Sequence, residues 1–297
     1  MASGTTMVET LPQRILGKTG MSVPVLGLGT APAGMGLPDD QAIALFHLSL
    51  DLGVTYLDTA PGYDRAQKQL GHVMKDRRDE AFLVTKTHTA NAKKAIEILE
   101  QSLSDLQTDH VDMTFVHSVG SLSGDEILSK DGALAGLREA QKRGLTRFVG
   151  FTAHNRPAIA AQILKEADVD ALMVAMNFVD RHTYQFETEV LPLAAKQRAG
   201  VAAMKVFGGA PNMKYENPTG SILSQTEADD HELAFRYALG LPGVHVAVIG
   251  VFGEEELHQN VAWAKNYAPL SERELAQLCQ AGAKVATSWG AHFGPVT

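Results

Sequence analysis

The feature that most constrains the fold is a repeated alternation between short apolar segments and segments with helical spacing. Eight apolar segments of four or five residues have the length and composition of buried parallel strands. They are Val25–Gly29, Thr55–Asp58, Phe82–Lys86, Met113–His117, Arg147–Phe151, Ala171–Ala175, Val201–Met204 and Val246–Gly250. Amphipathic helices are predicted between and after them, at Asp39–Leu52, Gln67–Val73, Ala92–Leu106, Ala133–Lys142, Arg156–Glu166, Glu187–Arg198, Asp229–Ala238 and Glu254–Tyr267. The pattern predicts an α/β fold, a closed (β/α)8 or TIM barrel.

A doubly wound sheet fits less well, because it usually has fewer strands and a GxGxxG fingerprint after the first, which this chain lacks. The length of 297 residues suits a barrel of one domain over residues 1–297, with residues 1–12 as a flexible tail. The run QRILGKTGMSVPVLGLGT predicts an N-terminal β-hairpin before the first barrel strand. Residues 118–131 and 206–230 interrupt the alternation and are predicted to be long loops on the active face. A helix after Ser271 and the final WGAHFGPVT predict a C-terminal extension over the barrel mouth.

Charge and cysteine content exclude several kinds of partner. The net charge of −8 argues against nucleic acid, because affinity for phosphate backbones comes from clustered Lys and Arg. A single cysteine, Cys279, excludes an intrachain disulfide or a cysteine-rich metal site and fits a reducing cytoplasm. No apolar run approaches the roughly 20 residues that span a bilayer, and the first residues lack the pattern of a signal peptide. We therefore expect a cytoplasmic protein that binds small molecules, not membranes.

Four polar residues, Asp58, Tyr63, Lys86 and His117, lie at or just beyond the ends of three consecutive apolar segments. Residues at the carboxyl ends of barrel strands meet at one mouth, so an acid, a phenol, an amine and an imidazole are expected to share one pocket. Singly, each residue has a structural explanation, such as a loop cap, a packed aromatic ring or a strand-end cation. Their combination favours a catalytic site.

Together the four side chains suit hydride transfer to a carbonyl group. The carbonyl oxygen must gain a proton, which Tyr63 could supply if the ammonium of Lys86 lowers its pKa from the usual value of about 10. Asp58 would pair with Lys86, and His117 could orient the carbonyl or relay a proton.

At this point the chain resembles the aldo-keto reductase superfamily. GVTYLDTAPGYD matches the signature GxxxxDTAxxY, LVTK resembles the lysine strand and FVHS the histidine strand of that family. GLTRFVGFTAHN and VAVIGVFGEEELHQN resemble its fifth and eighth strand segments, so the likeness covers residues 14–260. It implies NAD(P)H-dependent reduction of an aldehyde or ketone to an alcohol, or the reverse. Tyr63 would be the proton donor, Lys86 and Asp58 would tune it, and His117 would position the substrate.

The resemblance also implies a set of cofactor-binding residues. They are Gly29, Thr30, Asp58, Thr152, His154, Asn155, Met173, Met204, Lys205, Phe207, Gly209, Gly250, Phe252, Glu256, Gln259 and Asn260. Several depart from the family pattern, in which Ser-Asn and Gln hold the nicotinamide amide and a tyrosine stacks on its ring. Here Thr152-Ala153, Met173 and Met204 stand at those positions, and His154, Asn155 or Asn177 could substitute. Alternatively, His154 and Asn155 only cap the helix beginning near Arg156.

The residues expected near the cofactor's 2′-phosphate depart further from the family pattern. NADP-preferring relatives usually place Lys and Arg around the eighth βα loop, whereas residues 250–256 contain three glutamates and no base. NADP(H) is the family expectation, and NAD(H) or dual use stays open. Alternatively, the three glutamates have no role in cofactor choice and only stabilise the first turn of a helix.

The resemblance assigns the substrate contacts to Tyr63, His117 and three positions where well-studied relatives carry tryptophans. Those positions hold Ala31, His88 and Ser118. Without the aromatic walls we expect a wider or more polar pocket, suited to a polar carbonyl or a sugar-like molecule.

Two other functions stay open. One is a cofactor-sensing regulatory or accessory subunit with little turnover. The other is a metal-dependent barrel hydrolase that uses His88, His117 and His154. No metal is predicted, since no HxH pair ends an early strand.

Overall fold

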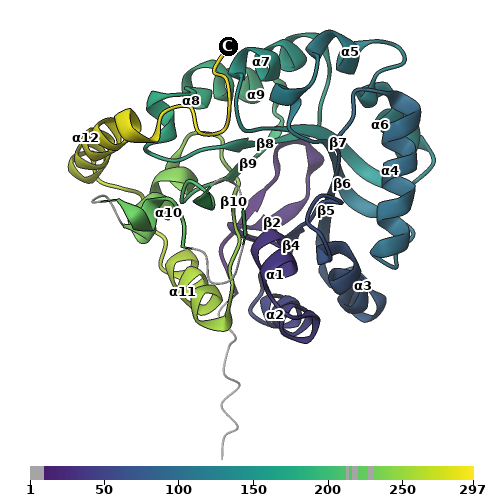
Figure 1. The fold of residues 1–297 in the computed structure, drawn as a ribbon, viewed down its shortest axis with the longest axis horizontal. Helices are drawn as coiled ribbons and strands as arrows, with labels where there is room; N and C mark the ends of the chain where they lie inside the picture. The colour runs from purple at the N-terminus through teal and green to yellow at the C-terminus, as the bar shows by residue number, and fades with distance from the viewer. Residues whose placement is uncertain (1–9, 212–213, 216–219, 227–229) are drawn as a thin grey trace, which may run out of the picture.

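The computed structural model describes residues 10–211, 214–215, 220–226 and 230–297. Eight parallel strands close into a barrel in the order β10-β3-β4-β5-β6-β7-β8-β9, surrounded by helices (Figure 1). The strands are β3 Leu26–Gly29, β4 Tyr56–Asp58, β5 Phe82–Thr87, β6 Val111–Val116, β7 Thr146–Ala153, β8 Ala171–Ala175, β9 Gly200–Met204 and β10 Val246–Ile249. The predicted (β/α)8 barrel is confirmed, and each predicted strand overlaps an observed one.

An antiparallel hairpin of β1 Gln13–Ile15 and β2 Ser22–Pro24 precedes the barrel, as predicted. Between its strands, the turn η1 Gly17–Thr19 docks on the barrel through the Lys18 N–H, which donates to the carbonyl of Arg198 at 2.6 Å. Leu16 and Val23 join the apolar cluster inside the barrel. The hairpin therefore closes the amino-terminal end of the barrel.

Apolar side chains fill the barrel interior. Tyr56 and Phe82 stack with ring centroids 5.3 Å apart, beside Met113 and Phe115. Toward the carboxyl ends of the strands the inward-facing residues become polar, at Asp58 and Lys86. Because burying unpaired polar groups is costly, these side chains are stable there only with partners. The polar site is thus confined to one end of the barrel.

The outer helices follow the predicted ranges closely. They are α2 Asp39–Asp51, α3 Ala66–Arg77, α4 Ala92–Asp105, α6 Ala133–Lys142, α7 Pro157–Glu166, α8 Phe186–Glu189, α9 Leu191–Gln197, α10 His231–Gly240 and α11 Glu254–Lys265. The 3-10 turns η2 Arg78–Glu80, η4 Asp180–His182 and η6 Leu223–Gln225 lie between them. The single helix predicted over Glu187–Arg198 is two helices, because Pro192 has no backbone N–H to continue the first helix and is accommodated in the first turn of the second.

Two further helical segments were not predicted. Helix α1 Ala31–Gly36 follows β3 directly, and α5 Gly124–Leu128, with the turn η3 Val119–Ser121, lies within the predicted loop 118–131. Both helices are too short to show a helical period in the sequence. Of the predicted flexible tail 1–12, residues 1–9 lie outside the described part of the chain, as does Asp229, the predicted start of α10.

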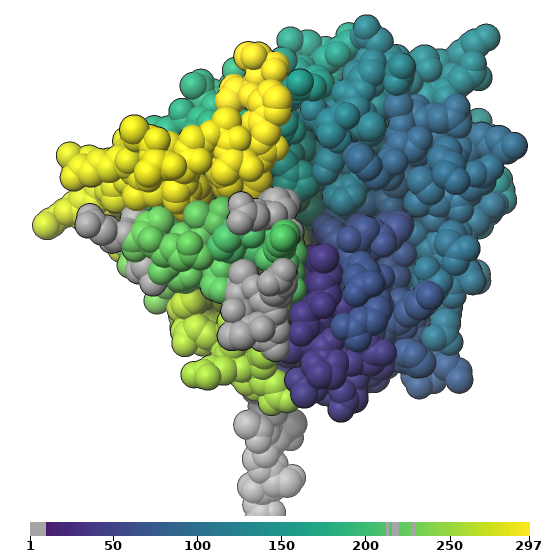
Figure 2. Space-filling model, viewed as in Figure 1, coloured from purple at the N-terminus to yellow at the C-terminus, as the bar shows by residue number. Residues whose placement is uncertain are grey.

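The C-terminal segment packs against the loops that follow β7 and β8. Helix α12 Glu272–Trp289 begins with a capping box between Ser271 and Glu274. Beyond it, the Phe293 N–H donates to Tyr184 Oη at 2.8 Å, and Tyr184 Oη donates to the Gly294 carbonyl at 3.1 Å. In Figure 2 this segment, in yellow, lies between the green region around α10 and the teal region around α7 and α8. No helix in the described ranges is long and apolar enough to cross a membrane.

Candidate active site

Lys86 connects three of the four predicted catalytic residues. Its side chain is 1% exposed, and its Nζ donates to Asp58 Oδ2 at 2.7 Å, to the Thr59 carbonyl at 2.9 Å and to Tyr63 Oη at 3.2 Å. Neighbouring parallel strands explain the meeting: β4 ends at Asp58, and Lys86 lies near the end of β5 beside it. The ammonium therefore has three acceptors inside the barrel, where water does not reach it.

The pKa of Tyr63 is shifted in the direction opposite to the predicted one. Burial, followed by the negative charge of Asp58, raises the pKa of Tyr63 well above 10. The expected lowering of the Tyr63 pKa by Lys86 is wrong for the protein alone, because burial is the largest effect and the charge of Asp58 opposes that of the ammonium. Burial raises the pKa of Asp58 and lowers the pKa of Lys86, and their mutual attraction opposes both shifts. Tyr63 therefore carries its proton at neutral pH and has it to donate.

Three histidines form a cluster that contacts the phenol through His117. The His117 ring lies edge-on to Tyr63 with centroids 6.2 Å apart, and the centroids of His88 and His154 are 6.0 and 6.2 Å from that of His117. Burial, helped by the charge of Lys86, lowers the pKa of His117 well below 6.5. Burial and the charge of Lys205 do the same for His154. Both imidazoles are neutral at pH 7, so each offers one N–H donor and one acceptor.

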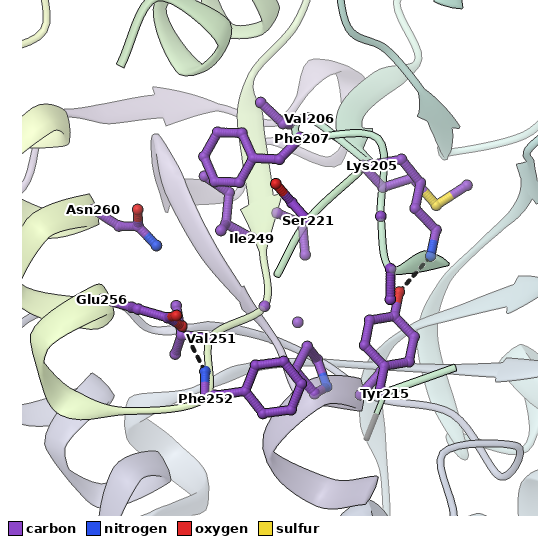
Figure 3. A pocket seen from close by; sticks show the side chains of 18 of the residues that line it. Lys205, Val206, Phe207, Tyr215, Ser221, Ile249, Val251, Phe252, Glu256 and Asn260 are labelled. Carbon is purple, nitrogen blue, oxygen red and sulfur yellow. Dashed lines mark hydrogen bonds between the residues drawn. The ribbon is translucent and has the colours of Figure 1, made fainter. Parts of the chain in front are cut away.

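Tyr63 lines a cavity of about 540 Å³. The same cavity reaches the start of α11, where Phe252 and Glu256 line it (Figure 3). Thirteen of the predicted cofactor residues line it: Gly29, Asp58, His154, Met173, Met204, Lys205, Phe207, Gly209, Gly250, Phe252, Glu256, Gln259 and Asn260. Of the predicted substrate residues, Ala31 and Tyr63 line it. Glycine is needed at Gly250, where an added Cβ would lie 2.5 Å from the ring of Pro32.

Other predicted residues lie beside this cavity. Thr30 is buried at the start of α1. Thr152 Oγ1 accepts the N–H of Ser118 at 2.8 Å, and Ser118 Oγ lies 3.1 Å from His154 Nδ1. Asn155 is buried but does not cap α7, whose N-cap is Arg156 without a side-chain capping hydrogen bond. His88 Nε2 lies 2.9 Å from Ser121 Oγ. Their roles in binding stay predictions.

Sequence reasoning missed several lining residues. The clearest is Tyr215, whose Oη lies 2.6 Å from Lys205 Nζ across the cavity wall. It belongs to the loop after β9, which has no periodicity from which to place a side chain. The other missed residues are Pro32, Val206, Ala210, Gly220, Ser221, Ser224, His231, Val248, Ile249, Val251, Glu255 and Trp263. Glu255 and Trp263 could have been found, because they share one helical face with Gln259.

Comparison with known proteins identifies the family. Residues 25–219 match the model of the aldo/keto reductase family. This chain belongs to that family. It is 32% identical to a methylglyoxal reductase of Salmonella typhimurium, over 74% of this chain and 80% of the relative. It is 25% identical to a pyridoxal 4-dehydrogenase of Microbacterium luteolum, over 86% of this chain and 94% of the relative.

A solved aldo/keto reductase from Klebsiella pneumoniae, in complex with NADP and acetate, has the same fold. Its TM-score is 0.72 at 22% identity, covering 90% of this chain and 94% of that one. Family membership makes this aldo/keto reductase an NAD(P)H-dependent oxidoreductase of carbonyl groups, as predicted. In the described part of the chain, no three His, Cys, Asp or Glu side chains are grouped to hold a metal ion.

The two neutral histidines should make folding stability depend on pH. In the unfolded chain they take up protons near pH 6.5, whereas His117 and His154 in the folded protein stay neutral to a much lower pH. The unfolded state then binds more protons, so we expect the free energy of unfolding to fall as the pH drops below 6.5. The limit is about 1.4 kcal/mol per pH unit for each histidine.

Urea unfolding at pH 7.0 and pH 5.5, roughly spanning the expected window, measures this dependence. The variant His154→Gln should show a weaker dependence than the wild type. His258→Gln, which removes an exposed imidazole on α11, is the matched control. Equal pH dependence in the wild type and in His154→Gln would contradict the assignment of a buried neutral imidazole.

Proposed function

We propose that this aldo/keto reductase interconverts polar aldehydes or ketones and their alcohols, with Tyr63 as the proton donor and a nicotinamide dinucleotide in the cavity. The observation that carries the proposal is the hydrogen-bonded group of Lys86, Asp58 and Tyr63, of which Asp58 and Tyr63 line the cavity. The reducing compartment suggested by the lone cysteine leads us to place the enzyme in the cytoplasm.

The residues that line the cavity suit a dinucleotide. Its volume of about 540 Å³ is in the range of cofactor pockets. Met173 and Met204 offer polarizable surface for an aromatic ring near Tyr63. Gly209 and Ser221 also line it, as does Asn260, which is buried and makes no side-chain hydrogen bond within the described residues. The bound NADP of the Klebsiella pneumoniae relative supports a nicotinamide dinucleotide in this cavity and agrees with the family expectation of NADP(H).

When bound, the reduced cofactor supplies a hydride to the carbonyl carbon. The protein must then protonate the oxygen, which becomes more basic than a phenolate. Tyr63 holds the proton, because its raised pKa keeps the phenol protonated. Lys86 fixes the phenol oxygen by a hydrogen bond and Asp58 fixes Lys86. The neutral His117 ring lies next to the phenol, which supports a role for its N–H as a donor to the same carbonyl oxygen.

The walls beside Tyr63 support a polar substrate. His88, His154 and Ser118 provide hydrogen-bonding groups around His117, where a pocket for apolar aldehydes would be aromatic. The C-terminal Phe293 adds one apolar surface, with its ring 5.9 Å from that of His154. The names of two relatives, a methylglyoxal reductase and a pyridoxal 4-dehydrogenase, also indicate small oxygen-rich carbonyl compounds.

A substrate comparison tests the polar pocket. We expect a higher kcat/KM for hydroxylated aldehydes than for unsubstituted aldehydes of equal length. The variant His154→Phe should lower kcat/KM about tenfold for the hydroxylated aldehyde, which corresponds to about one hydrogen bond. The unsubstituted aldehyde is the internal control and should be affected much less. A uniform loss for both substrates would count against a polar contact at His154.

A further inference from the structure

We propose that the α11 end of the cavity selects a cofactor with a free ribose 2′-hydroxyl, so that this enzyme prefers NAD(H) to NADP(H). The inference rests on the proposed function, since it assumes that the cavity holds the dinucleotide with its nicotinamide near Tyr63. The adenosine ribose then lies toward the start of α11, where Phe252, Glu255 and Glu256 line the cavity. Relatives that bind NADP would instead predict a preference for NADP(H).

The charge at this end is negative. Helix α11 begins with Glu254, Glu255 and Glu256, and the last two line the cavity. Glu256 Oε2 accepts the N–H of Phe252 at 2.7 Å, which holds the carboxylate at the rim (Figure 3). Its other oxygen has no hydrogen bond within the described residues. A carboxylate fixed in this way can accept a hydrogen bond from a ribose hydroxyl, as acidic residues do in other dinucleotide sites.

The described residues at this end of the cavity offer no Lys or Arg to pair with a 2′-phosphate. Lys205 is the only Lys or Arg among the described lining residues. It lies on the opposite side of the pocket from Glu256, with its Nζ 2.6 Å from Tyr215 Oη (Figure 3). The residues outside the described part, 1–9, 212–213, 216–219 and 227–229, include no Lys or Arg either. A phosphate dianion would therefore face two carboxylates without a paired base.

A second observation indicates that this end is built for a polar ligand. Asn260 is one helical turn beyond Glu256, which places the two side chains on the same face of α11. Its side chain lines the cavity and is 4% exposed, yet it makes no hydrogen bond within the described residues. Because this amide makes no internal hydrogen bond and is still reached from the cavity, it is available to bond to a ligand there.

Equilibrium binding tests the preference without turnover. Trp263 lines the cavity, so its fluorescence should be quenched when NADH or NADPH binds. At one fixed ionic strength we expect the wild type to bind NADH at least about tenfold more tightly than NADPH. The variant Glu256→Gln should bring the Kd values for NADH and NADPH closer together. Glu256→Arg should make NADPH the tighter ligand, because arginine pairs with the phosphate.

Glu254→Gln is the matched control. It removes a carboxylate from the same helical turn at a position that does not line the cavity, so the ratio of the two Kd values should stay unchanged. Glu255→Gln gives a second lining variant if Glu256→Gln is unstable. Wild-type protein that binds NADPH as tightly as NADH, or more tightly, would overturn the preference while leaving the proposed function intact. Binding of neither cofactor would overturn both.

Discussion

Tyr63→Phe is expected to lower kcat for carbonyl reduction by about 10²- to 10⁴-fold, the usual contribution of a general acid. The variant keeps the aromatic ring and removes only the hydroxyl that accepts from Lys86 at 3.2 Å. Nothing else near the carbonyl can replace it easily: His117 is neutral because burial lowers its pKa, and Lys86 is held by Asp58. The Kd for the cofactor should differ from the wild-type value by only a few-fold, since the hydroxyl is needed for the proton transfer and not for holding the cofactor.

The control for this variant is Tyr215→Phe. Tyr215 also lines the cavity, but its hydroxyl pairs with Lys205. We expect a change of at most roughly tenfold, from the loss of one hydrogen bond. Steady-state kinetics and cofactor titration of both variants separate the two roles. Near-full activity of Tyr63→Phe with cofactor bound would rule out the phenol as the acid.

Lys86→Met is expected to affect both stability and activity. Removing the ammonium leaves Asp58, which is 4% exposed, without its charged partner, and breaking a buried ion pair in this way costs about 3–5 kcal/mol. The Tyr63 hydroxyl also loses its donor, so kcat should fall even where the variant is folded. Urea unfolding and steady-state kinetics measure the two effects separately.

The pH dependence gives a sharper test of the same variant. Burial already raises the pKa of Asp58, and the attraction of Lys86, which opposes that shift, is lost in Lys86→Met. The folded variant then holds a proton on Asp58 that the unfolded chain releases above its pKa of about 3.9. The destabilisation relative to the wild type, measured as the difference in unfolding free energy at each pH, should therefore be smallest at low pH and grow as the pH rises through the raised pKa of Asp58.

The double variant Lys86→Met with Asp58→Asn distinguishes structure from catalysis. Replacing both charges should recover part of the stability, because no uncompensated carboxylate remains buried. Activity should not recover, since Tyr63 still lacks its hydrogen-bond donor. Full activity in either variant would contradict the role given to Lys86.

The barrel and its polar end could be predicted because both follow from local patterns. Each strand is a short apolar run, and the carboxyl end of a parallel strand fixes where the next polar residue lies. Asp58 and Lys86 therefore could be placed side by side from sequence alone. The short helices α1 and α5 could not, and the break at Pro192 was missed because the apolar spacing continues across it.

Other parts of the site depend on tertiary packing. The loop after β9 has no period, so the contact of Lys205 with Tyr215 was not foreseeable. The pKa of Tyr63 was predicted in the wrong direction, because its burial and the charge balance between Lys86 and Asp58 become visible only in three dimensions. Residue identity gives the candidate groups, whereas desolvation decides their protonation.

The central claim is that this aldo/keto reductase turns over a carbonyl substrate in the cavity beside Tyr63. The most direct measurement follows the absorbance of reduced cofactor while wild-type protein is mixed with a panel of hydroxylated aldehydes and ketones, and quantifies the alcohol formed. We predict one alcohol formed for each cofactor molecule oxidised over many turnovers, and little turnover with Tyr63→Phe. Tight cofactor binding without alcohol formation across the panel would contradict this account and would favour a cofactor-sensing subunit.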